Sequence, residues 1–532
     1  MKRRYLTPVY LALATAFGVL LGIVIARSDS AGNANSVIVN KGGNTNLVDK
    51  VFYLLENDYV DTVNLSKLQV DAVTHVIDQM DPHSEYFEPE VLEEVNEDLQ
   101  GSFEGIGVTF RIEKDTTTII STIKGGPSEK VGIRGGDRIV YVDDSLFVGK
   151  GINNNNKVMK ALKGPRGTKV DVKIFRRGVD ELLDFTITRN VIPTYSVDVS
   201  YMLNDTTGYI KLSKFIATTH REFVNAAKKL LQQGMKELIF DLRGNSGGYL
   251  VEAVDIADEF LPKGSLIVYT QGEHRERQYI FARRRGMLEN TPVKILIDEG
   301  SASASEIVAG ALQDNDRGTI IGRRSFGKGL VQEQFDLGDG AGLRLTVARY
   351  YTPTGRCIQK PYDGDREKYL YEAYDRYSSG EMFSADSIHF ADSLKYTTPG
   401  GKIVYGGGGI MPDIYVALKS DSTEYFFNKI VNASIVFQHA FDYSDSHRDD
   451  ILKYADANAF DKKFKFTDKM FNDILKEAEK KNLTGTKEQK EVAKKLTAPL
   501  FKAYVARDIF GDEAFYKLYQ PMDEILQEAL KK

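Results

Sequence analysis

The sequence predicts a multidomain α/β protein, in which an α/β core carries an inserted β-rich module and has helical regions before and after it. Strands and helices alternate from residue 191, short strands crowd residues 101–190, and Lys/Glu-rich amphipathic stretches fill residues 419–532. The chain has 532 residues, which gives room for several domains that each bury a core.

Composition excludes several classes of protein. The formal net charge of −5 argues against nucleic-acid binding, because proteins that bind phosphate backbones usually present a basic face. The single cysteine, Cys357, and the seven histidines exclude a disulfide framework and a cysteine-rich zinc module. We expect no metal, no cofactor and no nucleic-acid partner.

The N-terminal residues predict a membrane anchor. Basic residues 2–4 precede an uncharged run over residues 5–26. At 1.5 Å per residue such a run reaches roughly 30 Å, the thickness of the hydrocarbon layer. Because basic flanks stay in the cytoplasm, we expect a single-pass inner-membrane protein whose chain after residue 27 lies on the periplasmic (extracytoplasmic) side. A cleaved signal peptide, with residues 24–26 at the cleavage site, is the alternative.

Composition and hydrophobic periodicity divide the rest of the chain into regions. These are an anchor or signal (1–27), a linker (28–46), a helical region (47–100), a β-rich module (101–190), the α/β core (191–418) with a polar insertion (361–400), and a helical C-terminal region (419–532).

Within the core, predicted strands at 207–215, 236–244 and 293–300 alternate with predicted helices at 220–234, 249–261 and 305–315. This repeated order predicts a largely parallel sheet. Residues 322–351 then return to strands and read as a hairpin.

The first loop of chemical interest is DLRGNSGG, residues 241–248, between a strand and a helix. Its glycines let the backbone turn tightly and expose N–H groups at a helix N-terminus, which suits an anion or oxyanion. A plain tight turn explains the loop equally well. The spacing is not that of a dinucleotide-binding fingerprint.

The second loop is a run of alternating serines, Ser301, Ser303 and Ser305, before a helix. Ser303 and Glu306 fit a capping box, in which the hydroxyl serves only the helix start. Alternatively, one serine acts as a nucleophile at the strand end and the following backbone N–H faces a developing oxyanion. Spacing alone favours the cap and does not choose among the serines.

The third loop, GRRSFGKG at 322–329, nearly matches a phosphate-binding loop. Gly329 stands where a Mg²⁺-binding Ser or Thr is required, so nucleotide binding is disfavoured. Lys328 is either a surface hairpin lysine or a desolvated amine whose lowered pKa lets it accept a serine proton. His274 and His389, the histidines on either side of the serine run, do not sit at strand ends of the core.

Taken together, these residues resemble a known family, the carboxy-terminal processing peptidases or tail-specific proteases, which are serine peptidases with a Ser–Lys pair. The resemblance spans residues 49–413. The matching stretches are DPHSEYF (81–87), GIGVTF (105–110), GIRGGDRI (132–139), DLRGNSGG (241–248), GSASASEIVAGALQD (300–314), FGKGLVQ (326–332) and LTVARYYTPTGR (345–356).

The resemblance implies a nucleophile, Ser303, a general base, Lys328, and a residue that orients the lysine, Gln332. It implies an oxyanion hole made by the backbone N–H groups of Gly248 and Ala304. Residues four apart in a strand share one face, so Lys328 and Gln332 are expected to point into the same site.

The resemblance also implies that the β-rich module is a PDZ domain. Its backbone at Gly105, Ile106, Gly107 and Val108 would hold a peptide's terminal carboxylate, with the peptide added as a strand. Val158 and Leu162 are either neighbours of that peptide or core residues.

The expected function is therefore ATP-independent, PDZ-guided endopeptidase cleavage of proteins near free C-terminal tails. The alternative is a latent or inactive peptide-binding scaffold of the same fold. The sequence leaves homo-oligomerisation open.

Overall fold

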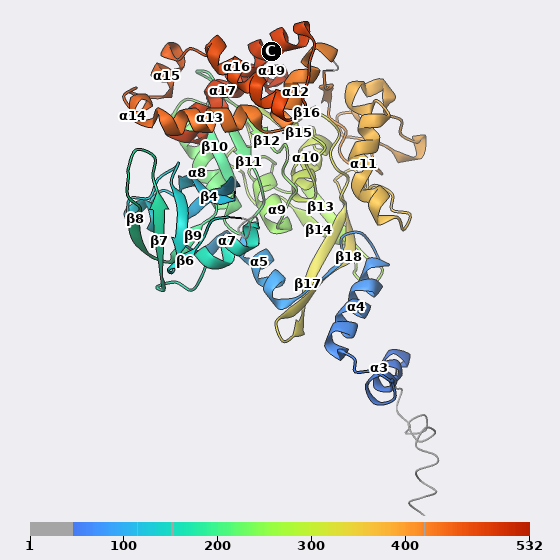
Figure 1. The fold of residues 1–532 in the computed structure, drawn as a ribbon. Helices are drawn as coiled ribbons and strands as arrows, with labels where there is room; N and C mark the ends of the chain where they lie inside the picture. Colours follow the sequence, from blue (N-terminus) through green and yellow to red (C-terminus); the bar gives the residue numbers. More distant parts are fainter. Residues whose placement is uncertain (1–45, 114, 150–153, 420, 532) are drawn as a thin grey trace, which may run out of the picture. The chain divides into compact units, whose positions relative to one another are not determined.

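The computed structural model describes residues 46–113, 115–149, 154–419 and 421–531. The chain divides into two compact units, one ending at Val76 and one beginning at Ile77. The first unit holds the helix α3 (Leu47–Asn57) and most of α4 (Leu65–Asp78). All other elements belong to the second unit (Figure 1).

The predicted single-pass inner-membrane location is corrected. In the part of the chain that the structure describes, no helix combines the length and the apolar character needed to cross a bilayer. The segment on which the prediction rested, residues 5–26, lies outside the described residues.

The α/β core is confirmed, and its central sheet has the order β10-β11-β12-β15-β16-β21. β10 runs antiparallel to β11, and every other pairing is parallel. The strands are β10 (Val197–Met202), β11 (Thr207–Leu212), β12 (Glu237–Asp241), β15 (Val293–Ile297), β16 (Thr319–Gly322) and β21 (Ile414–Tyr415), and the connecting helices are α8 (Thr219–Gln232), α9 (Leu250–Asp258) and α10 (Ala304–Asp314).

Successive residues of each central strand face opposite sides of this sheet. On β12, Leu238 and Phe240 pack with α8, α9 and α10, while Ile239 packs in a separate cluster with residues of the C-terminal helix α19 (Glu524–Ala529). All three strand residues are fully buried. The sheet is therefore covered on both faces, as its near-continuous apolar strands require.

A second sheet has the order β1-β18-β13-β14, with β17 also paired to β18. The predicted hairpin is confirmed as β17 (Leu330–Gly338) and β18 (Ala341–Tyr351), drawn in yellow in Figure 1. The remaining strands are β1 (Glu85–Phe87), β13 (Leu266–Gln271) and β14 (Gln278–Phe281). β1 was not expected, because the sequence pattern of residues 47–100 is helical apart from this short segment.

Residues 101–190 form their own sheet, in which β3-β4-β5-β7-β8 are neighbours in that order and β6 pairs with β5. Its elements are β3 (Val108–Glu113), β4 (Thr116–Thr122), α6 (Pro127–Lys130), β5 (Arg138–Val142), β6 (Ser145–Leu146), α7 (Asn155–Leu162), β7 (Lys169–Phe175) and β8 (Leu183–Thr188). β2 (Ser102–Gly105) and β9 (Asn190–Pro193) pair with each other at the two ends of this region. Val158 and Leu162 of α7 are buried in its core.

The polar insertion and the C-terminal region are mainly helical. The insertion holds α11 (Arg366–Ser378), η1 (Glu381–Phe383), η2 (Ala385–Ser387), η3 (Asp392–Leu394) and β19 (Lys395–Thr397), and β19 pairs with β20 (Ile403–Tyr405). The helix α5 (Pro89–Gln100) precedes β2. The C-terminal elements are η4 (Ser422–Glu424), α12 (Tyr425–Asn432), α13 (Ile435–Ser446), α14 (Arg448–Ile451), α15 (Ala457–Lys463), α16 (Asp468–Lys480), α17 (Lys487–Phe510), α18 (Asp512–Tyr519), η5 (Gln520–Met522) and α19.

The C-terminal region is fastened to the core by polar contacts as well as by apolar packing. Arg243, in the DLRGNSGG loop, donates two hydrogen bonds of 2.7 Å to the Asp523 carboxylate. The same guanidinium binds the buried carboxylate of Asp241. Lys294 of β15 donates to the carbonyl of Ala529 at 2.8 Å.

The packing of α19 predicts a stability effect. Leu526 is 2% exposed and packs against the central sheet, so Leu526→Ala should lower the free energy of unfolding by about 2–5 kcal/mol through lost burial and a residual cavity. Denaturant unfolding measures this change. Leu452→Ala, at a leucine that is 54% exposed, is the matched control and should change stability by about 0.5 kcal/mol or less. Equal effects of the two variants would contradict the packing role of α19.

Candidate active site

A cleft of about 570 Å³ lies where the three loops of the sequence analysis meet. Ser303, Lys328, Gln332 and Gly248 all line it. The helix α5 contributes Asp98 to the lining, and the strand β18 contributes Arg344 and Tyr350. The sequence-predicted catalytic side chains are therefore brought to one cavity.

The three serines of the run have different surroundings. Ser301 and Ser305 are fully buried, and their hydroxyls donate to the carbonyls of Leu242 and Asn245 at 2.9 and 2.8 Å. These two serines fasten the glycine loop to the start of α10. Ser303 is half-buried and is the serine of the run that lines the cleft.

Ser303 has a strained backbone. Its φ of 54° is uncommon for a residue with a side chain, and such conformations cost on the order of 1–3 kcal/mol. The predicted capping box is present, and Ser303 N–H donates to the Glu306 carboxylate at 2.8 Å. Capping of α10 and exposure of Ser303 to the cleft therefore occur together.

The glycine loop packs directly against this turn. A Cβ on Gly247 would come within 2.7 Å of Ser303 Cβ, and a Cβ on Gly248 would come within 2.0 Å of the Phe215 carbonyl oxygen. Both positions therefore require glycine. Among the hydrogen bonds of the described residues, neither the Gly248 nor the Ala304 N–H has a protein acceptor. Both amides are available to another acceptor.

Lys328 lies in the loop just before β17, and not in the strand as the residue spacing suggested. Its Nζ donates to Gln332 Oε1 at 2.8 Å, and Gln332 Nε2 donates to the His83 carbonyl at 2.5 Å. Gln332 therefore links the lysine head to the backbone at His83. Within the described residues, no hydrogen bond joins Lys328 Nζ to Ser303 Oγ.

Burial sets the protonation of Lys328. Desolvation of the ammonium, together with the positive charge of Arg344, lowers the pKa of Lys328 to about 8. The carboxylates of Asp81, Glu306 and Glu85 oppose this change. A lysine with this pKa is partly neutral near physiological pH, which a general base requires.

Glu306 has a larger role than the sequence analysis gave it. Its carboxylate accepts hydrogen bonds from the N–H groups of Ser303, Gly327 and Lys328 at 2.8, 2.7 and 2.9 Å, and from Ser325 Oγ at 2.5 Å. Burial raises the pKa of Glu306 to about 7. The capping-box pattern located this residue, but its bonds to the lysine loop depend on a contact between distant segments.

His83 also contributes to the site, although the sequence marked it only as part of the DPHSEYF stretch. Burial, and then the charge of Lys328, lowers the pKa of the His83 imidazole to about 3, so the ring is neutral. Its Nε2 is within 2.9 Å of the Tyr369 hydroxyl. The ring is therefore engaged with Tyr369, and it is the His83 carbonyl that serves the site.

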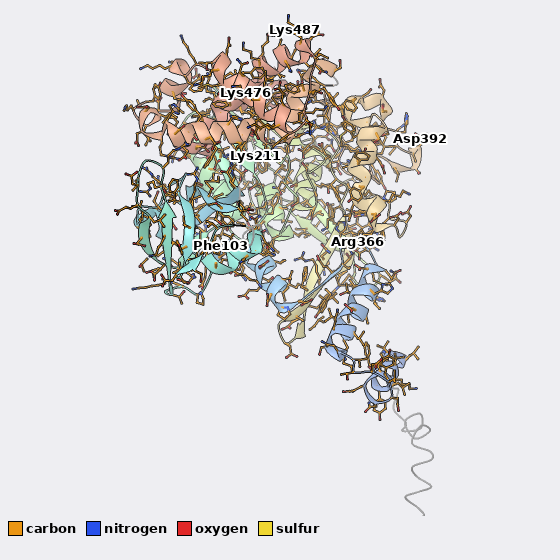
Figure 2. All side chains as sticks on the ribbon, viewed as in Figure 1. Phe103, Lys211, Arg366, Asp392, Lys476 and Lys487 are labelled. Carbon is orange, nitrogen blue, oxygen red and sulfur yellow. The ribbon has the colours of Figure 1, made fainter. Side chains whose placement is uncertain are left out.

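A second cavity of about 320 Å³ lies between the β-rich module and α5, whose Glu94, Glu97 and Asp98 line it. Gly105, Ile106, Gly107 and Val108 all line it, together with Leu162 of α7. Leu162 therefore belongs both to the core and to the wall of this groove. Phe103, labelled in Figure 2, contributes an aromatic side chain to the same groove.

No group of three or more His, Cys, Asp or Glu side chains in the described residues is arranged to hold a metal ion.

Residues 206–365 match the sequence profile of Peptidase family S41. The chain is also 37% identical over 314 residues to the carboxy-terminal-processing protease of Bartonella bacilliformis, an alignment covering 58% of this chain and 71% of the relative. The chain belongs to the carboxy-terminal processing proteases of peptidase family S41. It is a serine-type peptidase.

Three further similarities concern larger or other parts of the chain. The protease is 32% identical over 353 residues to the carboxy-terminal processing protease CtpA of Bacillus subtilis, which covers 65% of this chain and 74% of the relative. It also matches the solved structure of a photosystem II D1 C-terminal processing protease at 26% identity and a TM-score of 0.37, over 69% of this chain and 85% of the other. Residues 426–511 of the protease match a family of unknown function (DUF8443).

The contacts of Glu306 predict a loss of activity in Glu306→Gln. The amide nitrogen of glutamine cannot accept the two hydrogen bonds that one carboxylate oxygen now receives, and each unpaired buried donor costs about 1–3 kcal/mol. We expect a lower melting temperature and at least a tenfold fall in kcat of the protease, measured on a peptide substrate. Glu513→Gln, at a glutamate whose side chain is 49% exposed, is the matched control. Full activity in Glu306→Gln would contradict the role of these bonds.

Proposed function

We propose that this protease is an ATP-independent endopeptidase that cleaves proteins near their C-terminal tails with Ser303 as nucleophile and Lys328 as general base. Ser303 Oγ would attack the scissile carbonyl as its proton moves to neutral Lys328 Nζ. The lysine then returns the proton to the leaving amine, and water releases the acyl group from Ser303. No metal or cofactor takes part in these steps.

The observation that carries the proposal is the meeting of Ser303 and a half-buried, Gln332-bound Lys328 in one cleft. The oxyanion of the tetrahedral intermediate would be held by the N–H groups of Gly248 and Ala304, which have no protein acceptor among the described residues. Loss of one such contact commonly lowers kcat by about 10²–10³.

We further propose that residues 101–190 are a PDZ domain that receives the substrate's C-terminus. The groove lined by Gly105, Ile106, Gly107 and Val108 also has apolar side chains in its lining, among them Phe103, Phe110, Met159 and Leu162. Among the described residues, the N–H groups of Ile106 and Gly107 donate to no protein acceptor, which supports carboxylate binding there.

One observation favours a second candidate, a latent form of the same enzyme or an inactive scaffold. In this structure Lys328 Nζ donates to Gln332, and no hydrogen bond among the described residues joins it to Ser303. Proton transfer therefore requires Lys328 Nζ and Ser303 Oγ to come within hydrogen-bond distance. A scaffold would bind peptides without ever making this movement.

The role of Lys328 predicts a pH dependence. Only the neutral amine accepts a proton, so kcat/KM should be maximal above the Lys328 pKa of about 8 and fall about tenfold per pH unit below it. Initial rates on an unstructured peptide with an apolar C-terminus measure this profile. Ser303→Ala should show no cleavage at any pH.

Two results would contradict this assignment. Cleavage retained by purified Ser303→Ala would remove Ser303 as nucleophile, and a flat wild-type profile down to pH 5 would remove Lys328 as base. Peptide binding by a wild type that never cleaves would favour the scaffold.

The PDZ proposal predicts that the substrate's terminal carboxylate is required for tight binding. Full-length Ser303→Ala should bind a labelled peptide with a free carboxylate about 10–100-fold more tightly than the same peptide with a C-terminal amide, since a charge-assisted hydrogen bond is worth about 1.5–3 kcal/mol. Fluorescence polarisation measures both affinities. Acetylation of the peptide's N-terminus is the control and should change nothing. Equal affinity for acid and amide would contradict carboxylate recognition.

A further inference from the structure

The polar insertion reaches the loop that carries Lys328. Its helix α11 begins at Arg366, labelled in Figure 2, and ends with Arg376 in its last turn. Arg376 is only 4% exposed, which is unusual for an arginine. A buried guanidinium is stable only where its N–H donors are paired. The acceptors of the Arg376 guanidinium therefore identify the segment that it fixes.

Every donor of the Arg376 guanidinium has a partner. Nη1 donates to the carbonyls of Arg324 and Ser325 at 3.2 and 2.8 Å, and Nη2 donates to the carbonyl of Phe326 at 3.2 Å. Nε and the second Nη2 hydrogen bind the Glu372 carboxylate at 2.9 and 3.0 Å. Arginine has five donors, and three of them go to consecutive backbone carbonyls.

These carbonyls belong to the residues that lead directly to Gly327 and Lys328. In the same loop, the N–H groups of Gly327 and Lys328 donate hydrogen bonds to the Glu306 carboxylate of α10. Backbone polar groups that are buried must be paired. In this loop α10 supplies the acceptor and α11 supplies the donor, so the backbone next to Lys328 is held by both helices.

A second cation anchors α11 beside the loop. Lys360 Nζ lies 3.9 Å from the centroid of the Phe326 ring and 4.1 Å from that of Tyr369, and it pairs with Glu372 at 2.9 Å. Glu372 thus receives both Lys360 and Arg376. Lys360 and Arg376 thus contact the loop while Glu372 pairs with both of their charges.

We propose that Arg376 is a positioning residue, through which the insertion fixes the loop that presents Lys328 to Ser303. The proposal rests on Lys328 being the general base. Arg376 does not line the cleft and touches no reacting atom. Its effect on catalysis therefore passes through the position of Lys328, and it should alter kcat while leaving KM nearly unchanged.

The pKa of Lys328, measured in solution, reports on how deeply its side chain is buried. Burial is the largest cause of its lowered pKa, so a loop that moves toward solvent should return this pKa toward the ordinary lysine value of 10.5. A residue that only stabilises the fold would lower the melting temperature and the amount of active enzyme without moving the acidic limb of the pH–rate profile.

The experiment compares pH–rate profiles of full-length wild type, Arg376→Ala, Arg376→Lys and Lys368→Ala, each assayed well below its own melting temperature. Lys368→Ala removes a positive charge from the same helix at a side chain that is 63% exposed and pairs with Asp363, so it is the matched control. We expect Arg376→Ala to lower kcat at pH 8 by about tenfold or more and to move the acidic limb up by about one pH unit or more.

Arg376→Lys keeps the charge and most of the volume but cannot span three carbonyls. We expect its acidic limb to move in the same direction by a smaller amount. This variant decides the question if Arg376→Ala does not fold. An acidic limb that stays at the wild-type pH in the folded variants would overturn the positioning role. A wild-type profile without an acidic limb would instead refute Lys328 as base, which separates failure of this inference from failure of the proposed function.

Discussion

The site depends on one buried carboxylate. Glu306 accepts the N–H of the strained Ser303 and the N–H groups of the loop that carries Lys328, so it fixes two segments that are separate in the sequence. The hydrogen bonds of Ser301 and Ser305 and the packing of Gly247 hold the nucleophile turn to the glycine loop, and Glu306 links it to the lysine loop. Because the carboxylate is completely enclosed, its bonds are made in surroundings of low polarity, where each is strong and each is costly to lose.

The sequence predicted the core well because its signals are local. The alternation of apolar strands and helices marked the parallel sheet, and Gly and Lys spacing marked the loops that meet at Ser303. What it could not predict depends on contacts between distant segments. β1 is three residues long and, among the described strands, pairs with β18 alone. Arg376 has no motif around it that points to the lysine loop. That all five N–H donors of Arg376 are paired can be recognised only from the folded structure.

Two arginines, Arg243 and Arg376, each join a loop of the site to another part of the chain. Arg243 joins the glycine loop to Asp523 of the C-terminal region, and Arg376 joins the lysine loop to the insertion. Planar guanidinium groups suit this task because several donors leave one rigid plane. The loops on both sides of Ser303 are thus tied to parts of the chain that lie outside the matched peptidase segment, residues 206–365.

The cover that α19 gives to the central sheet has a consequence for synthesis. Chains emerge from the ribosome N-terminus first, and α19 follows every strand that it covers. Ile239 and its neighbours on that face stay exposed, and Arg243 lacks Asp523, until the ribosome has passed Ala529. The glycine loop beside Ser303 therefore gains its tie to Asp523 only after every strand of the core has been synthesised, so a nascent chain that ends before Asp523 presents Ser303 beside a loop without that contact.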